Sequence, residues 1–208
     1  MNIGIVTQKF VTGDGQGSIN YAVAKAALER GHALVLLASE VAPPLLNSPS
    51  VTWIDVSPGA VPTQLLRDQI FAWKTSRWIR SHRSMLDLLM VNGAVTWCKA
   101  DVNVLHFVHS AWMTSEARRM EARSGPYSWY QTLYTRINAA WETWALRHSR
   151  HAVAVSSMVK DQVDALDLNL PVHVISNGVD LDTFSPDGPT VPRPEIGSPK
   201  NAPLALFV

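Results

Sequence analysis

Short runs of mostly apolar residues recur along the chain and alternate with longer segments of helical spacing. The runs are short enough to form buried strands, and they cover residues 2–6, 33–39, 51–56, 104–109, 151–155 and 171–176. The helical segments between them cover residues 19–31, 63–91, 127–147 and 156–166. Strands that alternate with helices form a parallel sheet with helices on both faces. We therefore predict an α/β fold built on a doubly wound, Rossmann-like parallel sheet.

The composition is that of a folded globular protein. Apolar residues make up 47% and charged residues 17% of the 208 residues, which argues against disorder. The formal net charge of +1 gives no reason to expect nucleic acid as a partner. A single cysteine, Cys98, fits a reducing compartment. The N-terminus lacks the features of a signal peptide, and no run reaches the roughly 18 apolar residues of a membrane span, so we expect a cytoplasmic protein.

The C-terminal part of the chain changes character. Six of the thirteen prolines fall between Pro186 and Pro203, with no periodic pattern among them. We expect three regions from this: an N-terminal domain over residues 1–186, an interdomain linker over 187–203, and the first strand of a second domain over 204–208.

Several polar or glycine-rich groups follow predicted strands directly. In doubly wound sheets, ligands bind outside the carboxyl ends of the strands. The groups at those ends are Gly13, Gly15 and Gly17, then His109, then Ser156, then Asn177 and Gly178. We therefore predict one cleft at the carboxyl edge of the sheet.

The glycine-rich loop after the first strand is open to three interpretations. Gly15 and Gly17 can let backbone N–H groups approach a phosphate beside a helix N-terminus. The spacing Gly13-x-Gly15-x-x-Ser18, with Glu40 after the second strand, imitates a dinucleotide fingerprint, but the loop is too long for its tight turn. A loop that binds nothing is the third interpretation.

Two histidines in the predicted strand 104–109 suggest a metal site at first. An odd separation along a strand sends His106 and His109 to opposite faces, so they do not share one ion, and we expect no metal or cofactor. We interpret His106 as a core residue. His109, at the end of the strand, is our candidate for a hydrogen-bond donor or proton carrier in the cleft.

The helical segment after the third strand has a basic face. It carries Lys74, Arg77, Arg80 and Arg83, with Trp73 among them. Such a face can lie on an anionic membrane surface or hold phosphate, and it can equally be a solvated surface.

Two blocks of the sequence resemble the family 4 glycosyltransferases, which are retaining enzymes with the GT-B fold. The more specific block runs from the strand that ends at Ser156 to Pro186. It matches the family signature through Asn177, Gly178, Val179, Asp180, Phe184 and Pro186. Near the start, the loop with Gly15, the following helix and the junction Arg30-Gly31-His32 are also similar to the family, although Asp14 replaces a usual glycine. His109 and Glu142 fall at further recurrent positions of the family.

The resemblance implies a function as well as a fold. It implies that residues 1–186 bind the acceptor, and that a second domain holds most contacts to a nucleotide-sugar donor. His109 is expected to be catalytic, and Gly15, Gly17, Ser156, Asn177 and Gly178 are expected to bind the donor phosphates or line the cleft. The expected reaction transfers a sugar to a glycan or lipid-linked acceptor in cell-surface polysaccharide or glycoconjugate synthesis. The basic face with Lys74, Arg77, Arg80 and Arg83, rather than the resemblance, is the reason to expect contact at the inner face of the membrane. Residues 1–208 alone are expected to be inactive.

Two other classes of function stay open on the sequence. One is a non-catalytic binding module with the same fold, and the other is a nicotinamide-dependent oxidoreductase. The donor sugar, the acceptor and the oligomeric state are not specified by these residues.

Overall fold

The structure is a computed structural model, and it describes residues 1–115, 126–179, 181, 185, 187 and 188. The chain divides into two compact units, Met1–Asn177 and Gly178–Val208. The predicted linker from residue 189 on, and the predicted strand 204–208, lie outside the described residues. The first unit contains every helix and strand in the described part of the chain.

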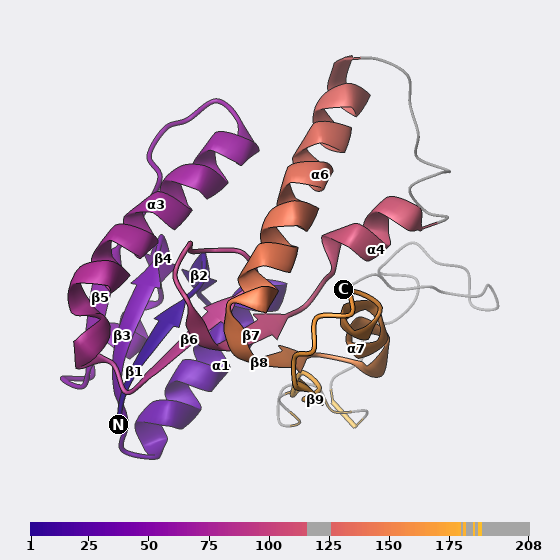
Figure 1. Ribbon diagram of the computed structural model, residues 1–208. Coiled ribbons are helices and arrows are strands. Elements are labelled where there is room, and N and C mark those ends of the chain that lie inside the picture. Colours follow the sequence, from indigo (N-terminus) through magenta and orange to yellow (C-terminus); the bar gives the residue numbers. More distant parts are fainter. Residues whose placement is uncertain (116–125, 180, 182–184, 186, 189–208) are drawn as a thin grey trace, which may run out of the picture. The chain divides into compact units, whose positions relative to one another are not determined.

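A parallel sheet forms the centre of this unit (Figure 1). In the described ranges, seven strands pair in the order β5-β3-β1-β6-β7-β8-β9. Their bounds are β1 Asn2–Val6, β3 Ala33–Ala38, β5 Val51–Asp55, β6 Leu88–Asn92, β7 Ala100–Leu105, β8 Ser149–Ala154 and β9 Val172–Val174. A separate two-stranded pair joins β2 (Lys9–Phe10) to β4 (Glu40–Val41). The predicted doubly wound, Rossmann-like parallel sheet is confirmed.

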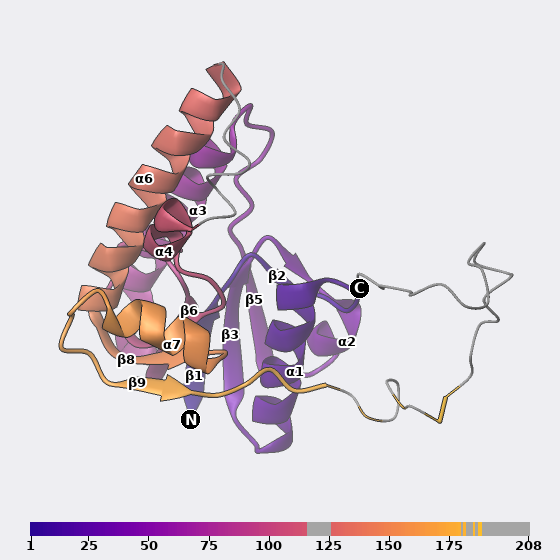
Figure 2. The ribbon, with the colours of Figure 1, turned by 90° about the vertical axis from the view of Figure 1, so that its right-hand side faces the viewer.

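Helices connect the strands and cover both faces of the sheet. Their bounds are α1 Gly15–Glu29, α2 Pro43–Leu46, α3 Gln64–His82, α4 His109–Thr114, α6 Pro126–Arg147 and α7 Ser157–Asp164, with a 3₁₀ turn at Arg83–Met85. Helices α1 and α3 lie on opposite sides of the sheet (Figure 2). None of the helices in the described ranges is long and apolar enough to cross a membrane.

Local signals in the sequence explain where α1 begins and ends. Asp14 caps the N-terminus, because its side chain accepts a hydrogen bond from the N–H of Gly17. At the other end Gly31 has a φ of +77°, which favours glycine, and its N–H donates to the carbonyl of Leu28. The next N–H, of His32, donates to the carbonyl of Ala27, which completes a Schellman motif. The predicted end of this helix at Gly31 is confirmed.

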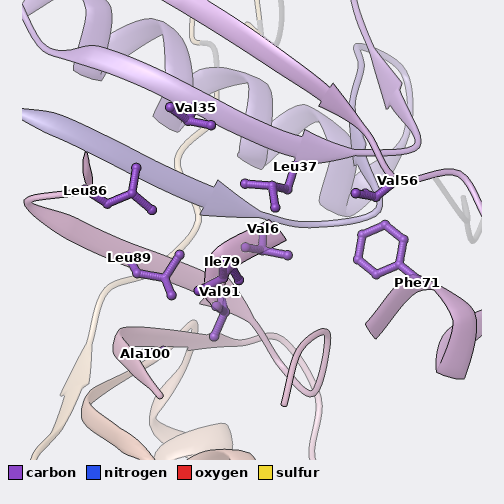
Figure 3. Packing of buried hydrophobic residues seen from close by; sticks show 10 residues of the cluster. All are labelled: Val6, Val35, Leu37, Val56, Phe71, Ile79, Leu86, Leu89, Val91 and Ala100. Carbon is purple, nitrogen blue, oxygen red and sulfur yellow. The ribbon is translucent and has the colours of Figure 1, made fainter. Parts of the chain in front are cut away.

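The core packs against the two faces of the sheet separately. On one face, α3 contributes Phe71 and Ile79 to a cluster with side chains of β1, β3 and β6, and Figure 3 shows how these side chains interlock. On the other face, Ala24 of α1 and Leu45 of α2 pack against Ile5 and its neighbours. These buried contacts fix the sheet, and therefore its carboxyl edge, as a rigid platform.

Three local predictions are wrong. The helix predicted over residues 63–91 ends at His82, and its last residues form the missed strand β6, so the six predicted strands of the main sheet become seven in the described ranges. The strand predicted over 104–109 ends at Leu105, and His109 begins α4 instead. The apolar spacing of residues 127–147 also predicts a core position for Leu133, but Leu133 has 37% of its surface exposed.

Candidate active site

A pocket of about 270 Å³ lies at the carboxyl edge of the sheet. Segments that follow β1, β6 and β7 form its floor, while α3 and α6 contribute side chains from above. After β1 the chain adds β3 and β5 on one side, and it later returns to add β6 on the other side. The pocket therefore lies at the point where the winding direction of the sheet reverses, which is where ligands bind in open α/β sheets.

His109 lies in this pocket and is held by Glu142. The two carboxylate oxygens of Glu142 each accept one hydrogen bond, from the backbone N–H of His109 at 3.0 Å and from its ring Nδ1 at 2.9 Å. The Glu142 side chain is only 3% exposed, whereas that of His109 is 30% exposed. Because a carboxylate oxygen only accepts, the ring nitrogen that faces it, Nδ1, carries a proton and donates.

The wall of the pocket beside His109 is aromatic. Phe107 is 46% exposed, and its ring meets that of His109 edge to face, with the centroids 5.2 Å apart. An exposed ring at this place can pack against the C–H face of a ligand while the histidine makes polar contacts.

A second carboxylate faces the same pocket from α3. Asp68 accepts hydrogen bonds from the hydroxyl of Tyr134 at 3.0 Å and from the side-chain amide of Gln64 at 2.8 Å. Burial raises the pKa of Asp68, although both hydrogen bonds act in the opposite direction. Burial and the Asp68 charge also raise the pKa of Tyr134, so its hydroxyl stays protonated and continues to donate.

Buried asparagines support the floor of the pocket. The side-chain amide of Asn20 donates to Thr7 Oγ1 at 2.8 Å and links α1 to the end of β1, while Asn92 joins the same group from β6. Asn92 Oδ1 and His106 Nε2 are buried and have no hydrogen-bond partner among the described residues. Burial also lowers the pKa of His106, which favours its neutral form.

Sequence analysis found only part of this site. It singled out His109, and the family resemblance marked Glu142 without a role. The apolar spacing of residues 127–147 indicates only a core position for Tyr134, and nothing in the sequence singles out Asp68, Asn92 or Asn138. The contacts that reveal these residues join positions between 33 and 85 apart along the chain, and no local pattern marks them.

Gly15 and Gly17 lie in the first turn of α1, and their surroundings differ. The N–H of Gly17 already donates to Asp14 at 3.0 Å. A Cβ added to Gly17 would lie 2.9 Å from Cγ2 of Val11, whereas a Cβ on Gly15 would meet nothing within 4 Å. Gly17 therefore permits close packing between helix and loop. The binding of phosphate by either glycine stays a prediction.

The different surroundings of the two glycines predict opposite effects of alanine. Gly15→Ala should leave the melting temperature unchanged or raise it, since alanine favours a helix by about 1 kcal/mol over glycine. Gly17→Ala should lower the free energy of unfolding by about 1–3 kcal/mol, because overpacking against a stiff valine outweighs that gain. Thermal unfolding of both variants tests this. An equal or higher stability of Gly17→Ala would contradict the close approach.

The remaining predicted site residues follow later strands. Ser156 caps α7, since its hydroxyl accepts a hydrogen bond from the N–H of Val159 at 3.2 Å. Asn177 is exposed after β9. Neither residue lines the pocket that contains His109. Gly178 begins the second unit, and its φ lies outside the left-handed region.

No metal-binding group is evident within the described ranges, where no three His, Cys, Asp or Glu residues lie close enough to hold an ion. His106 and His109 both lie beyond the end of β7, so the argument that a strand sends them to opposite faces does not apply.

The chain resembles known proteins both in sequence and in fold. A sequence profile described as Glycosyltransferase Family 4 matches residues 13–183. The chain belongs to this family. The match begins just before α1 and ends after β9. It therefore includes every strand of the seven-stranded sheet except β1, and every side chain that lines the pocket with His109 except those that follow β1. No curated protein sequence matches the chain significantly.

Solved structures show the same fold. WaaG, a glycosyltransferase involved in lipopolysaccharide biosynthesis, matches with a TM-score of 0.64 and 14% identity over 95% of this chain and 52% of its own. Sucrose-phosphate synthase from Thermosynechococcus elongatus matches with a TM-score of 0.65 and 12% identity over 97% of this chain and 54% of its own. The chain therefore spans about half the length of these two proteins, and its fold is that of the N-terminal domain of a GT-B glycosyltransferase.

Proposed function

We propose that this chain is the acceptor-binding side of a retaining glycosyltransferase. The enzyme would transfer a sugar from a nucleotide-sugar donor to a glycan or lipid-linked acceptor, in cell-surface polysaccharide or glycoconjugate synthesis. The observation that carries the proposal is the family match over residues 13–183, which includes His109 and the helices that hold it. The proposal assigns no metal or cofactor to the reaction.

In the proposed reaction, a hydroxyl oxygen of the acceptor bonds to the anomeric carbon of the donor sugar. The bond from that carbon to the phosphate oxygen breaks, and the nucleoside diphosphate leaves with the bonding electrons. The freed phosphate oxygen takes up the proton of the acceptor hydroxyl. The pocket at the carboxyl edge holds the acceptor hydroxyl and the sugar together, and this positioning supplies much of the rate.

His109 has the best-defined part in this proposal. With its Nδ1 proton held by Glu142, Nε2 can accept a hydrogen bond from a sugar hydroxyl at the reaction centre. The first turn of α1 is proposed to stabilise the leaving phosphate, because a helix N-terminus carries a partial positive charge of about half an elementary unit. Since the N–H of Gly17 already donates to the capping side chain of Asp14, the N–H of Gly15 is the better placed of the two to donate to a phosphate oxygen. Ser156, Asn177 and Gly178 are proposed to line the donor side of the cleft.

A transfer assay tests the function directly. The full-length protein is mixed with a panel of nucleotide sugars and with glycolipid and oligosaccharide acceptors, and release of nucleoside diphosphate is measured with product stereochemistry. We expect release that depends on acceptor, and a product that keeps the anomeric configuration of the donor. Binding of sugars without turnover of any donor would instead identify a binding module. Reduction of a substrate by a nicotinamide cofactor would identify an oxidoreductase.

We further propose that the basic face of α3 contacts an anionic membrane. In the structure this face has two parts. In the first, Lys74 donates to the carbonyl of Ser57, and Arg77 lies over the half-exposed ring of Trp73. In the second, Arg80 and Arg83 line the same pocket farther along the chain. Trp73 and Arg77 combine an aromatic ring with a cation, which suits the interface between headgroups and water.

The membrane proposal predicts salt-sensitive binding. The protein should sediment with vesicles that contain anionic lipid at low salt and be released at high salt, because screening weakens attraction between exposed charges. The double variant Lys74→Gln/Arg77→Gln should bind about 30-fold more weakly, since each of the two cations near an anionic surface contributes about 1 kcal/mol. Equal binding to neutral vesicles, or none to anionic ones, would contradict the proposal.

A further inference from the structure

A second pocket of about 810 Å³ lies at the amino edge of the sheet, which is the edge opposite to the one where His109 lies. It is bounded by the C-terminal ends of α3 and α6, which are the lower ends of these helices in Figure 1, and by the first residues of β7 and β8. The segment Trp97–Lys99, which precedes β7, closes it on a third side. The family site at the carboxyl edge does not use this pocket.

The pocket is strongly basic. Among the described residues that line it, the cationic ones are Arg80, Arg83, Lys99, Arg147 and Arg150. Asp101 is the one acidic side chain in that lining, so the formal charge of the pocket is +4 with His148 neutral. The whole chain has a formal charge of only +1, so this concentration of charge is local.

Asp101 organises part of the pocket rather than neutralising all of it. Its Oδ2 accepts from Arg83 Nη2 at 2.7 Å and from the N–H of Leu89 at 2.8 Å, while Oδ1 lies 3.3 Å from Arg150 Nη1. Arg83 is fixed further by a bond to the carbonyl of Leu86 at 2.7 Å. Two arginines are thus held in place around one carboxylate.

Three other cations in the pocket have no ion pair within the described ranges: Arg80, Lys99 and Arg147. All three are exposed. They come from three different segments, the end of α3, the segment before β7 and the end of α6, and the fold brings them to one hollow.

Helix dipoles explain only some of this charge. Cations in the last turn of a helix are favourable, which accounts for Arg80 and Arg147. Lys99 and Arg150 lie outside the last turns of these helices, so the helix dipoles do not account for them. The two helix ends contribute about −0.5 each, so five cations against Asp101 and both helix ends still leave about +3. A hollow with that charge attracts anions from solution.

We propose that this pocket binds a phosphate-bearing anion at a site separate from the transfer reaction. Arg80 and Arg147 can offer planar pairs of N–H donors to phosphate oxygens, Lys99 adds a mobile ammonium, and the fixed Arg83 extends the positive field. The half-buried ring of Trp97 in the same lining offers an apolar surface for the organic part of the ligand. The shared chemistry is a phosphate ester, whose source is a soluble phosphorylated compound or a phospholipid headgroup.

The test uses two variants of equal charge. Lys99→Gln/Arg147→Gln removes two unpaired cations from the pocket, and Lys25→Gln/Arg136→Gln removes two exposed cations from outside it. Inorganic pyrophosphate and glycerol 3-phosphate are titrated against the ¹⁵N-labelled chain, and the indole N–H of Trp97 is followed beside the backbone N–H of His109. Vesicles of phosphatidylcholine with and without phosphatidylglycerol form the second arm.

We expect saturable shifts at Trp97 and little change at His109. The dissociation constant should rise at least about tenfold in the pocket variant and less than about twofold in the control variant. Binding of the soluble phosphates alone identifies a soluble ligand, whereas competition between them and anionic vesicles identifies a headgroup. No shift at Trp97 with either probe, or equal weakening by both variants, would overturn the proposal. A failure of the sugar-transfer assay would not contradict this anion site, because neither the NMR titration nor the vesicle experiment depends on the sugar donor.

Discussion

Replacing His109 with asparagine should reduce the turnover number of the full-length enzyme by about 100-fold or more, with a melting temperature within about 3 °C of the wild type. The asparagine amide can stand where Nδ1 stands and keep the hydrogen bond to Glu142. The ring edge with Nε2 is lost, and in the proposed mechanism that edge contacts the reacting sugar. The measurements are turnover and thermal unfolding on the same preparation.

His109→Ala provides the matched comparison. It should lose at least as much turnover, but it should also be less stable by about 1–3 kcal/mol, because a buried carboxylate oxygen of Glu142 then lacks its donor. The difference between the two variants separates the catalytic part of His109 from its structural part. Normal turnover of His109→Asn, or a loss of turnover matched by unfolding, would mean that the histidine is structural.

The architecture followed from the sequence, because buried parallel strands are continuous apolar runs and the helices between them carry clear end signals. Gly31 and Ser156 mark helix boundaries by mechanisms that act over four or five residues, so sequence alone could locate them. Errors arose where the same apolar spacing is compatible with both a helix and a strand. Leu86 and Leu89 continue the apolar face of α3 in sequence, but they pack into the core from the turn and from β6.

The limits of β7 were misjudged for a related reason. Val108 lies beyond the strand, yet it is buried in the cluster beneath α7, so the loop has the apolar character of a strand. The consequence for the site was small, since His109 still reaches the carboxyl edge from the first turn of α4.

The partners of His109 were harder to predict than its position. Glu142 lies 33 residues later, on a helix whose spacing indicates only which side is buried. Asp68 and Tyr134 meet across 66 residues from two helices. Contacts of this kind depend on how helices pack over the sheet, and a single sequence does not contain that geometry in local form.

Replacing Glu142 with glutamine should reduce turnover by about 10- to 100-fold while the fold is kept, which is the range expected for a group that orients a functional histidine. Glutamine has nearly the same shape, but it has one acceptor oxygen where glutamate has two. If that oxygen accepts the backbone N–H of His109, the amide N–H₂ faces Nδ1 and favours the ring with its proton on Nε2. Nε2 then donates where the proposed mechanism needs it to accept.

The tautomer itself is the decisive readout for Glu142, because a merely structural residue would not change it. The ¹⁵N shifts of the His109 ring should show the proton on Nδ1 in the wild type and on Nε2 in Glu142→Gln. Glu142→Asp, which keeps two acceptor oxygens on a shorter side chain, should retain the wild-type tautomer and recover part of the turnover. Full turnover in Glu142→Gln would show that Glu142 does not position the histidine. Reduced turnover in Glu142→Gln with the proton still on Nδ1 would show the same. The loss would then arise from packing around the Glu142 side chain, which is 3% exposed.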